Sequence, residues 1–185
     1  MASVQPAETT NLLHAWRAGD GDARERLFGL FYPWLKQAAA GLLRNERAVS
    51  LSSGDLVHET VIRLIQLERI RWEDSAHFMA LASKFMRRVL VDHVRAKGAG
   101  KREHQRVLLT TRLEPQRPLD LQRLDEALVR LAAIDSDKAE IVEMRYFGGM
   151  SIADVAQVTG VSGRTVKRRW LAARLWLMDA MEAPL

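Results

Sequence analysis

Apolar residues recur every three to four positions along most of the chain, and no stretch alternates apolar and polar residues over a useful length. The first pattern is typical of helices with one buried face, and the lack of alternation argues against strands. We therefore predict an all-α protein. Pro33 is expected to kink one helix or to mark its boundary. The predicted helices cover residues 11–18, 22–43, 52–66, 74–97, 120–132 and 136–146, with a further pair between 151 and 170.

A change in composition at Lys97 divides these helices into two groups. The stretch 98–119 contains two glycines, two prolines, mixed charge and no sustained period. We interpret it as a flexible linker. Two small helical domains are then expected, at 11–97 and 120–183, after a disordered leader at 1–10.

Composition narrows the class of protein only moderately. The 185 residues carry 28 Lys and Arg against 23 Asp and Glu, a net charge of +5 that is compatible with a nucleic-acid partner. The absence of cysteine excludes a disulfide framework and a Cys-ligated zinc site. No secretion signal is recognisable, and no apolar stretch approaches the roughly 18 residues that a membrane span needs.

The strongest local pattern lies between Ser151 and Trp170. Two short helices that cross steeply need a small residue at the crossing, a turn residue that tolerates positive φ, and apolar inner faces. Ala156 and Gly160 stand where the first two are needed. Ser151 and Ser162 precede the two helices as N-caps. The sequence therefore predicts a helix-turn-helix.

Basic residues are concentrated near the start of the second helix of this pair. Such a helix enters the DNA major groove, where its N-terminal half reads base edges and its Arg and Lys side chains contact phosphates. The alternative, a solvated basic face on an ordinary helical hairpin, leaves the fixed spacing of small and apolar residues unexplained. The candidate DNA-binding residues are Ser162, Arg164, Thr165, Lys167, Arg168 and Arg169.

Three segments resemble the sigma-70 family of bacterial transcription factors. Residues 148–168 resemble region 4, residues 55–64 (DLVHETVIRL) resemble the core-binding helix of region 2, and residues 72–96 are similar to the helix that opens the −10 element. Two such regions joined by a short linker resemble the extracytoplasmic-function (ECF) group. The resemblance covers about residues 10–182. It implies a factor that binds core RNA polymerase and directs initiation at specific promoters.

The resemblance also implies which residues bind the β′ and β subunits of core polymerase and which bind promoter DNA. Carboxylates of region 2 would meet basic residues of β′, although the same carboxylates also suit helix capping and solubility. The implied core-binding residues are Asp55, Leu56, His58, Glu59, Ile62 and Arg63. The helix-turn-helix would read the −35 element.

A long helix with a basic face would hold the −10 element. Its cations would bind the phosphates of melting DNA, while Trp72 and His77 would contact an extruded base. Trp72 suits a place in the core equally well. The implied −10 residues are Trp72, His77, Lys84, Arg87, Arg88 and Arg95.

The core-binding helix has fewer acidic residues than is common in the broader group. Phosphorylation of Thr60 would add about −1.5 to −2 charge beside Glu59. We therefore raise the hypothesis that a Ser/Thr kinase switches core binding on at Thr60, with Ser52 and Ser53 as secondary sites; an ordinary helical threonine is the alternative. An anti-sigma factor is the other regulator to be expected from the resemblance.

Two other classes of protein fit parts of the sequence. An enzyme is disfavoured, because His58 and Glu59 begin like a zinc-protease motif but position 62 is Ile, where the second ligand would stand. No catalytic residue, metal site or cofactor is therefore expected. A stand-alone helix-turn-helix regulator would explain residues 151–170 but not the pattern of region 2. A bacterial cytoplasmic protein is expected.

Overall fold

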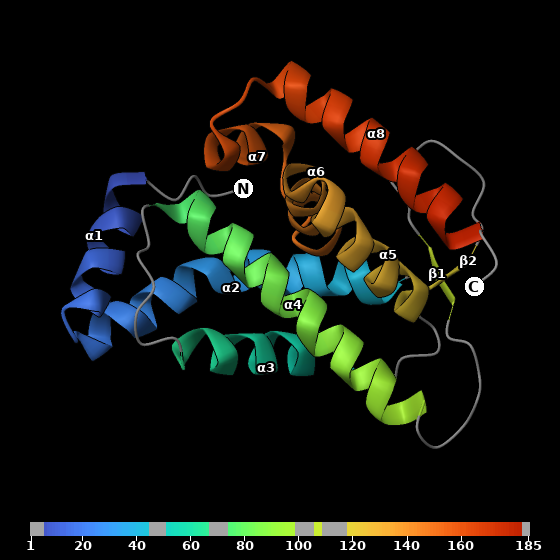
Figure 1. Ribbon diagram of the computed structural model, residues 1–185. Helices are drawn as coiled ribbons and strands as arrows, with labels where there is room; N and C mark the ends of the chain where they lie inside the picture. Colours follow the sequence, from blue (N-terminus) through green and yellow to red (C-terminus); the bar gives the residue numbers. More distant parts are fainter. Residues whose placement is uncertain (1–5, 45–50, 67–73, 99–105, 109–117, 183–185) are drawn as a thin grey trace.

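The computed structural model describes residues 6–44, 51–66, 74–98, 106–108 and 118–182. In these ranges the chain is helical apart from its turns and one pair of short strands (Figure 1). The first half contains α1 (Pro6–Arg17), α2 (Gly21–Arg44), α3 (Ser53–Ile65) and α4 (Ser75–Gly98). The second half contains α5 (Leu121–Ile134), α6 (Ser136–Val142), the π-helical segment η1 (Glu143–Phe147), α7 (Ile152–Thr159) and α8 (Gly163–Glu182).

The predicted all-α class is confirmed, with one small addition. Strands β1 (Arg106–Leu108) and β2 (Pro118–Asp120) pair antiparallel, with Val107 opposite Leu119. Strands of three residues are too short for a repeating pattern to reveal them in the sequence. They lie in the predicted linker, except that β2 extends to Asp120, where a helix was expected to begin. The rest of the linker, apart from Gly98 at the end of α4, lies outside the described residues.

The N-terminal helix begins earlier than predicted. Helix α1 starts at Pro6, and Thr9 is fully buried, so residues 6–10 do not belong to a disordered leader. Gly19 ends this element with a φ of +95°, a backbone conformation that glycine adopts readily. Asp20 caps α2, because its side chain accepts the backbone N–H of Ala23 at 3.0 Å.

Pro33 does not end α2, although the sequence allowed a boundary there. The helix runs from Gly21 to Arg44 with Pro33 on its exposed side. A proline inside a helix costs about 3 kcal/mol. Burial of a continuous apolar stripe offsets this cost, because Leu27, Phe31 and Leu35 bracket the proline and are at most 4% exposed.

The two predicted domains are packed against each other. Helix α4 crosses the middle of the molecule, with α3 on one side and α5, η1 and α7 on the other (Figure 1). One hydrophobic core contains Phe78 and Leu90 from the first half together with Leu128 and Leu177 from the second. Phe31 stacks on Phe78 with ring centroids 4.4 Å apart. The core is therefore shared between the halves.

A second, smaller core joins the helix-turn-helix to the same central helix. Met150, Val155 and Val166 are fully buried in it, and Met79 and Ala80 of α4 pack against them. The helix-turn-helix thus rests on the first turns of α4.

Candidate nucleic-acid interface

The turn between α7 and α8 has the geometry that the sequence predicted. Ser151 and Asp154 form a reciprocal capping box, with the Asp154 N–H donating to the Ser151 hydroxyl at 3.1 Å and the Ser151 N–H to the Asp154 carboxylate at 2.9 Å. Gly160 ends α7 with a φ of +67°. Ser162 accepts the Thr165 N–H at 3.2 Å and so caps α8. These contacts fix the angle at which α8 leaves the turn.

Three of the predicted −35 cations point into solvent. Arg164, Lys167 and Arg168 are exposed, and their spacing of three and four residues places them on one face of α8. Arg169 differs, because its guanidinium pairs with Asp137 of α6 at 2.9 Å. In this structure Arg169 therefore ties α8 to its own domain instead of joining the exposed basic face.

Arg145 packs against Trp170 of α8, a contact that the sequence did not suggest. Its guanidinium lies 5.6 Å from the ring centroid of Trp170, and Arg174 lies over the same ring at 6.0 Å. Arg145 also donates a hydrogen bond to the carbonyl of Met150, just before α7. One half-buried cation thus links the loop before α7 to α8.

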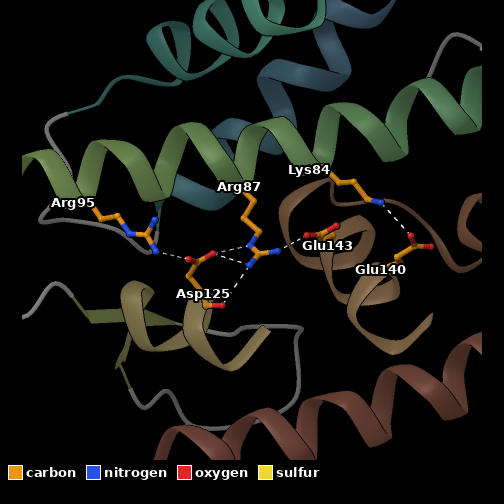
Figure 2. Close-up of polar contacts among 6 residues, drawn as sticks. All are labelled: Lys84, Arg87, Arg95, Asp125, Glu140 and Glu143. Atoms are coloured by element: carbon orange, nitrogen blue, oxygen red, sulfur yellow. Dashed lines mark hydrogen bonds and ion pairs between the residues drawn. The ribbon is translucent and has the colours of Figure 1, made fainter. Parts of the chain in front are cut away.

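Three of the four predicted −10 cations of α4 face carboxylates of the second half (Figure 2). Arg87 pairs with Asp125 at 2.7 Å and also with Glu143. Arg95 pairs with the other oxygen of Asp125 at 2.8 Å. The side chains of Arg87, Asp125 and Glu143 are 14%, 11% and 12% exposed, so these charges are largely withdrawn from water.

Lys84 is the third α4 cation that pairs with an acid of the second half. Lys84 lies one turn before Arg87 and pairs with Glu140 at 3.1 Å, with both side chains partly exposed. Arg88 differs from these three: it is exposed, and its guanidinium lies over the ring of Phe85. The structure therefore brings Lys84, Arg87 and Arg95 together on the face that the second half covers.

The two aromatic −10 candidates have different outcomes. Trp72 lies outside the described residues. His77 lies in the first turn of α4, and its Nδ1 is 3.1 Å from the carboxylate of Asp74. Burial alone would raise the pKa of Asp74, but hydrogen bonds from the His77 backbone and the Gln157 amide outweigh it and hold that pKa below its ordinary value. Asp74 thereby links α4 to α7.

The predicted core-binding residues of α3 divide by exposure. Leu56 is fully buried and cannot contact another protein in this arrangement, which corrects its assignment. Asp55 and His58 are exposed. Ser52 donates to Asp55 in a capping box, and this hydrogen bonding lowers the Asp55 pKa. The carboxylate is thus both a cap and an exposed charge.

The other half of this set is partly buried. Glu59, Ile62 and Arg63 have intermediate exposure. Arg63 donates to Asp92 of α4 at 2.9 Å and pairs with Glu59 at 3.4 Å, so it ties α3 to α4. A polymerase surface at this point would meet a fixed ion pair.

Thr60, the hypothetical phosphorylation site, is fully buried. Its hydroxyl donates to the carbonyl of Leu56 at 2.7 Å within α3. A kinase cannot reach this hydroxyl while the helix is packed. The structure therefore corrects the phosphorylation hypothesis in favour of an ordinary helical threonine that bonds to the preceding turn.

The sequence did not reveal the acidic partners of the α4 cations. Asp125, Glu140 and Glu143 occupy helical positions with no motif of their own, and each lies 30 to 56 residues from its partner. Charge complementarity between the basic face of α4 and these acids was the one available signal. This complementarity can be used as a signal only when the relative position of the two halves is already known.

Among the residues that the structure describes, no group of three or more His, Asp or Glu residues lies close enough to hold a metal ion. None of the described helices is both long and apolar enough to cross a bilayer.

The sequence model of the family described as ECF sigma factor matches residues 6–183. The chain belongs to the ECF sigma factors. As a sigma factor, the protein binds core RNA polymerase and promoter DNA and directs promoter-specific initiation. No curated protein sequence matches this sigma factor.

Two solved structures resemble this sigma factor across most of its length. CnrH, in complex with the cytosolic domain of CnrY, shares 19% identity and a TM-score of 0.45 over 96% of this chain and 99% of that chain. The sigma factor RpoE, in complex with the anti-sigma factor NepR from Bartonella quintana, shares 20% identity and a TM-score of 0.41 over 87% of this chain and 98% of that chain.

Proposed function

We propose that this sigma factor reads the −35 element with the start of α8 and holds the −10 element along α4. The observation that carries the first part is the exposed row of Arg164, Lys167 and Arg168 directly after a capped, glycine-containing turn. A helix presented in this way enters the major groove with its N-terminal half. Ser162 and Thr165 add hydroxyl groups at the same end.

The second part rests on the basic face of α4. Lys84, Arg87, Arg88 and Arg95 recur at spacings of one, three and seven residues along one helix, which suits a run of phosphates. Three of these cations face the second half of the chain, so the two halves must separate before DNA reaches them. We accordingly propose two functional domains, 11–97 and 120–183, that move apart in the holoenzyme.

Core polymerase is proposed to dock on the exposed side of α3. Asp55 and His58 are exposed there, with Glu59, Ile62 and Arg63 partly exposed beside them. Rim charges of this kind steer association and fix its register. Leu56 supports this surface from the core instead of contacting the polymerase.

The chemistry of initiation is proposed to belong entirely to the polymerase, with no catalytic residue in this chain. A cytoplasmic location follows from that partnership. Regulation by an anti-sigma factor or by a Ser/Thr kinase stays a prediction. Thr60 is no longer the favoured site for a kinase.

Transcription with purified components tests the proposal. The chain is mixed with core RNA polymerase and a library of promoter fragments, and the transcripts are sequenced from their 5′ ends. We expect the chain to co-elute with core and to select one class of start site with shared −35 and −10 sequences. Random starts in the presence of the chain would overturn the proposal.

The same materials distinguish a stand-alone helix-turn-helix regulator. Such a regulator binds specific duplex DNA by itself, typically with a Kd of 10⁻⁸ to about 10⁻¹¹ M. We expect weak duplex binding by the free chain and specific binding by the holoenzyme. Tight specific binding without core, together with no stimulation of initiation, favours the regulator.

A further inference from the structure

We propose that the second half of the free chain inhibits the first, by presenting Asp125, Glu140 and Glu143 to the α4 cations in the place of DNA phosphates. This inference rests on the proposed −10 role of α4 and adds a regulation to it. The closed arrangement is an inactive state that core polymerase must open.

The ion pairs give the first support. Arg87 is held by two carboxylates, Asp125 and Glu143, and Asp125 bridges onward to Arg95 at 2.8 Å (Figure 2). Carboxylate oxygens and phosphate oxygens compete for the same guanidinium donors, because both accept two parallel N–H bonds. A DNA strand on this face therefore has to displace the acidic side chains first.

The covering of this face gives the second support. A cleft of about 430 Å³ remains between α4 and the α5–α6 pair, and both walls are charged. Its α4 wall carries the cations Lys84, Arg87, Arg88 and Arg95 together with Asp92, and the opposite wall carries the three acids. Lys84, Arg87 and Arg95 are thus paired with acids across the cleft, which reduces the net attraction of this face for a polyanion.

Other contacts along α4 also hold the two halves in this closed arrangement. A Cβ at Gly148 would lie 1.9 Å from the hydroxyl oxygen of Ser83 and 3.0 Å from its Cβ, so only glycine permits this approach of η1 to α4. At the start of α4, the Gln157 amide donates to Asp74 at 3.2 Å. Contacts of three kinds, apolar, hydrogen-bonded and ionic, therefore hold the same pose.

The pairing of charges makes the state switchable. Arg87, Asp125 and Glu143 are nearly buried when closed, and all three regain water or phosphate when the halves part. Loss of one partner leaves an uncompensated buried charge, which favours opening. A polymerase that binds only the separated halves shifts the same equilibrium by its differential affinity.

The test uses the full chain and takes advantage of its lack of cysteine. Spin labels on Gln37→Cys of α2 and Ala172→Cys of α8, both exposed positions, report the separation of the halves by pulsed electron resonance. The opening variant is Asp125→Asn with Glu143→Gln. Its control is Glu126→Gln with Asp179→Asn, which makes the same change in charge at two exposed positions of α5 and α8.

We expect one narrow distance distribution in the parent and the control, and a longer, broader one in the opening variant. A fluorescent single-stranded DNA of about 15 nucleotides, near the upper end of the site sizes seen for single-strand binding, should bind the opening variant about tenfold more tightly, or about 1.4 kcal/mol. Circular dichroism verifies that all chains remain helical. Equal distances and equal DNA affinities in variant and control overturn the inference.

A milder variant covers the case in which the double substitution unfolds the chain. Glu140→Gln removes only the partly exposed partner of Lys84. We expect a smaller change in the same direction, and an unchanged distribution and unchanged DNA affinity overturn the inference here too.

The failure of the inference is distinguishable from the failure of the proposed function. If the chain does not support promoter-specific initiation with core polymerase, parent and variants fail alike in transcription. If only the inference is wrong, all of them initiate, and the distances and single-strand affinities of variant and control coincide.

Discussion

Exposure distinguishes neighbouring arginines at the start of α8. Arg168 is exposed, whereas Arg169 is held by Asp137. We predict that Arg168→Ala weakens holoenzyme binding to promoter DNA by about 1–3 kcal/mol if it reads a base, or reduces the salt slope by about one if it contacts a phosphate. Promoter binding by the holoenzyme, measured over a salt series, checks both.

Arg169→Ala is the comparison for that prediction. Its main effect is expected on the thermal midpoint of the chain, since it frees α8 from α6. Equal losses of promoter affinity in the two variants would contradict the distinction between them.

Thr60 provides a second test at the scale of one side chain. Because its hydroxyl is buried and bonds only within α3, Thr60→Ala should transcribe normally and lose about 1 kcal/mol of stability. Thr60→Glu would bury a charge and should cost more than about 3 kcal/mol, lowering activity instead of raising it. Run-off transcription and thermal melts of both variants give the answer. A strongly active Thr60→Glu would restore the phosphorylation hypothesis.

Local chemistry makes some residues predictable and leaves others hidden. The sequence places Ser151, Gly160 and Ser162 correctly, because caps and turns depend on neighbours within four residues. Leu56 and Arg169 suit binding surfaces by pattern, yet one is buried and the other is paired across helices. Their environment depends on α4 and α6, which a local pattern does not position.

The N-terminus of α6 gives a prediction at the scale of one helix. Asp135 accepts the backbone N–H of Lys138 at 3.0 Å and pairs with its ammonium at 2.8 Å, and these interactions lower the Asp135 pKa below its ordinary value of 3.8. Since the pKa is lowered in the folded state, the stabilisation is present above the ordinary value and is lost as pH falls through the folded pKa.

Two variants distinguish the contribution of the helix cap to stability from that of the Asp135 charge. Asp135→Ala should cost about 1 kcal/mol at pH 7 and lose that part of the acid sensitivity. Asp135→Ser should retain most of the cap while losing the same acid sensitivity. Thermal melts from pH 7 to below the ordinary pKa test both, and a parent-like acid response in Asp135→Ala would contradict the assignment.

The existence of a helix is easier to predict than its continuity. The period of residues 136–146 predicts one helix, but the segment is α6 followed by a π turn, in which the Gly148 N–H bonds back to the Glu143 carbonyl at 3.2 Å. A π turn inserts one residue and rotates the later side chains about the helix axis, which periodicity over so few residues does not resolve. Pro33 misleads for the opposite reason, because burial on both sides of it outweighs a local cost.

Gly148 tests the packing of the whole molecule. A methyl group there would meet Ser83 at 1.9 Å and the Met144 carbonyl at 2.8 Å, so Gly148→Ala should push η1 away from α4 and cost about 1–3 kcal/mol. Gly41→Ala in α2 is the matched control, because nothing lies within 4 Å of its Cβ and alanine favours a helix.

The readouts are the thermal midpoint and the label distance between the halves. We expect a lower midpoint and a longer distance for Gly148→Ala, and an unchanged or higher midpoint for Gly41→Ala. An unchanged midpoint for Gly148→Ala would show that the close approach is not rigid.

The relative position of the two halves is the feature of the fold that the sequence predicts least well. The linker suggests independent domains, while the shared core of Phe78 and Leu128 and the ion pairs of Arg87 depend on contacts between residues far apart in the chain. Each half shows only an ordinary apolar or charged face when it is considered alone. The match between two such faces appears when both are folded.

The carboxylates facing α4 also bear on how the free chain moves through a cell full of DNA. Asp125 and Glu143 are attached to the same polypeptide as Arg87, so they compete with the genome at the high effective concentration of a tethered ligand. A bacterial chromosome offers about 10⁶ or more nonspecific sites that would otherwise bind the cations of α4. The built-in polyanion mimic shields α4 from these sites in unassembled molecules, while Arg164, Lys167 and Arg168 of α8 stay exposed.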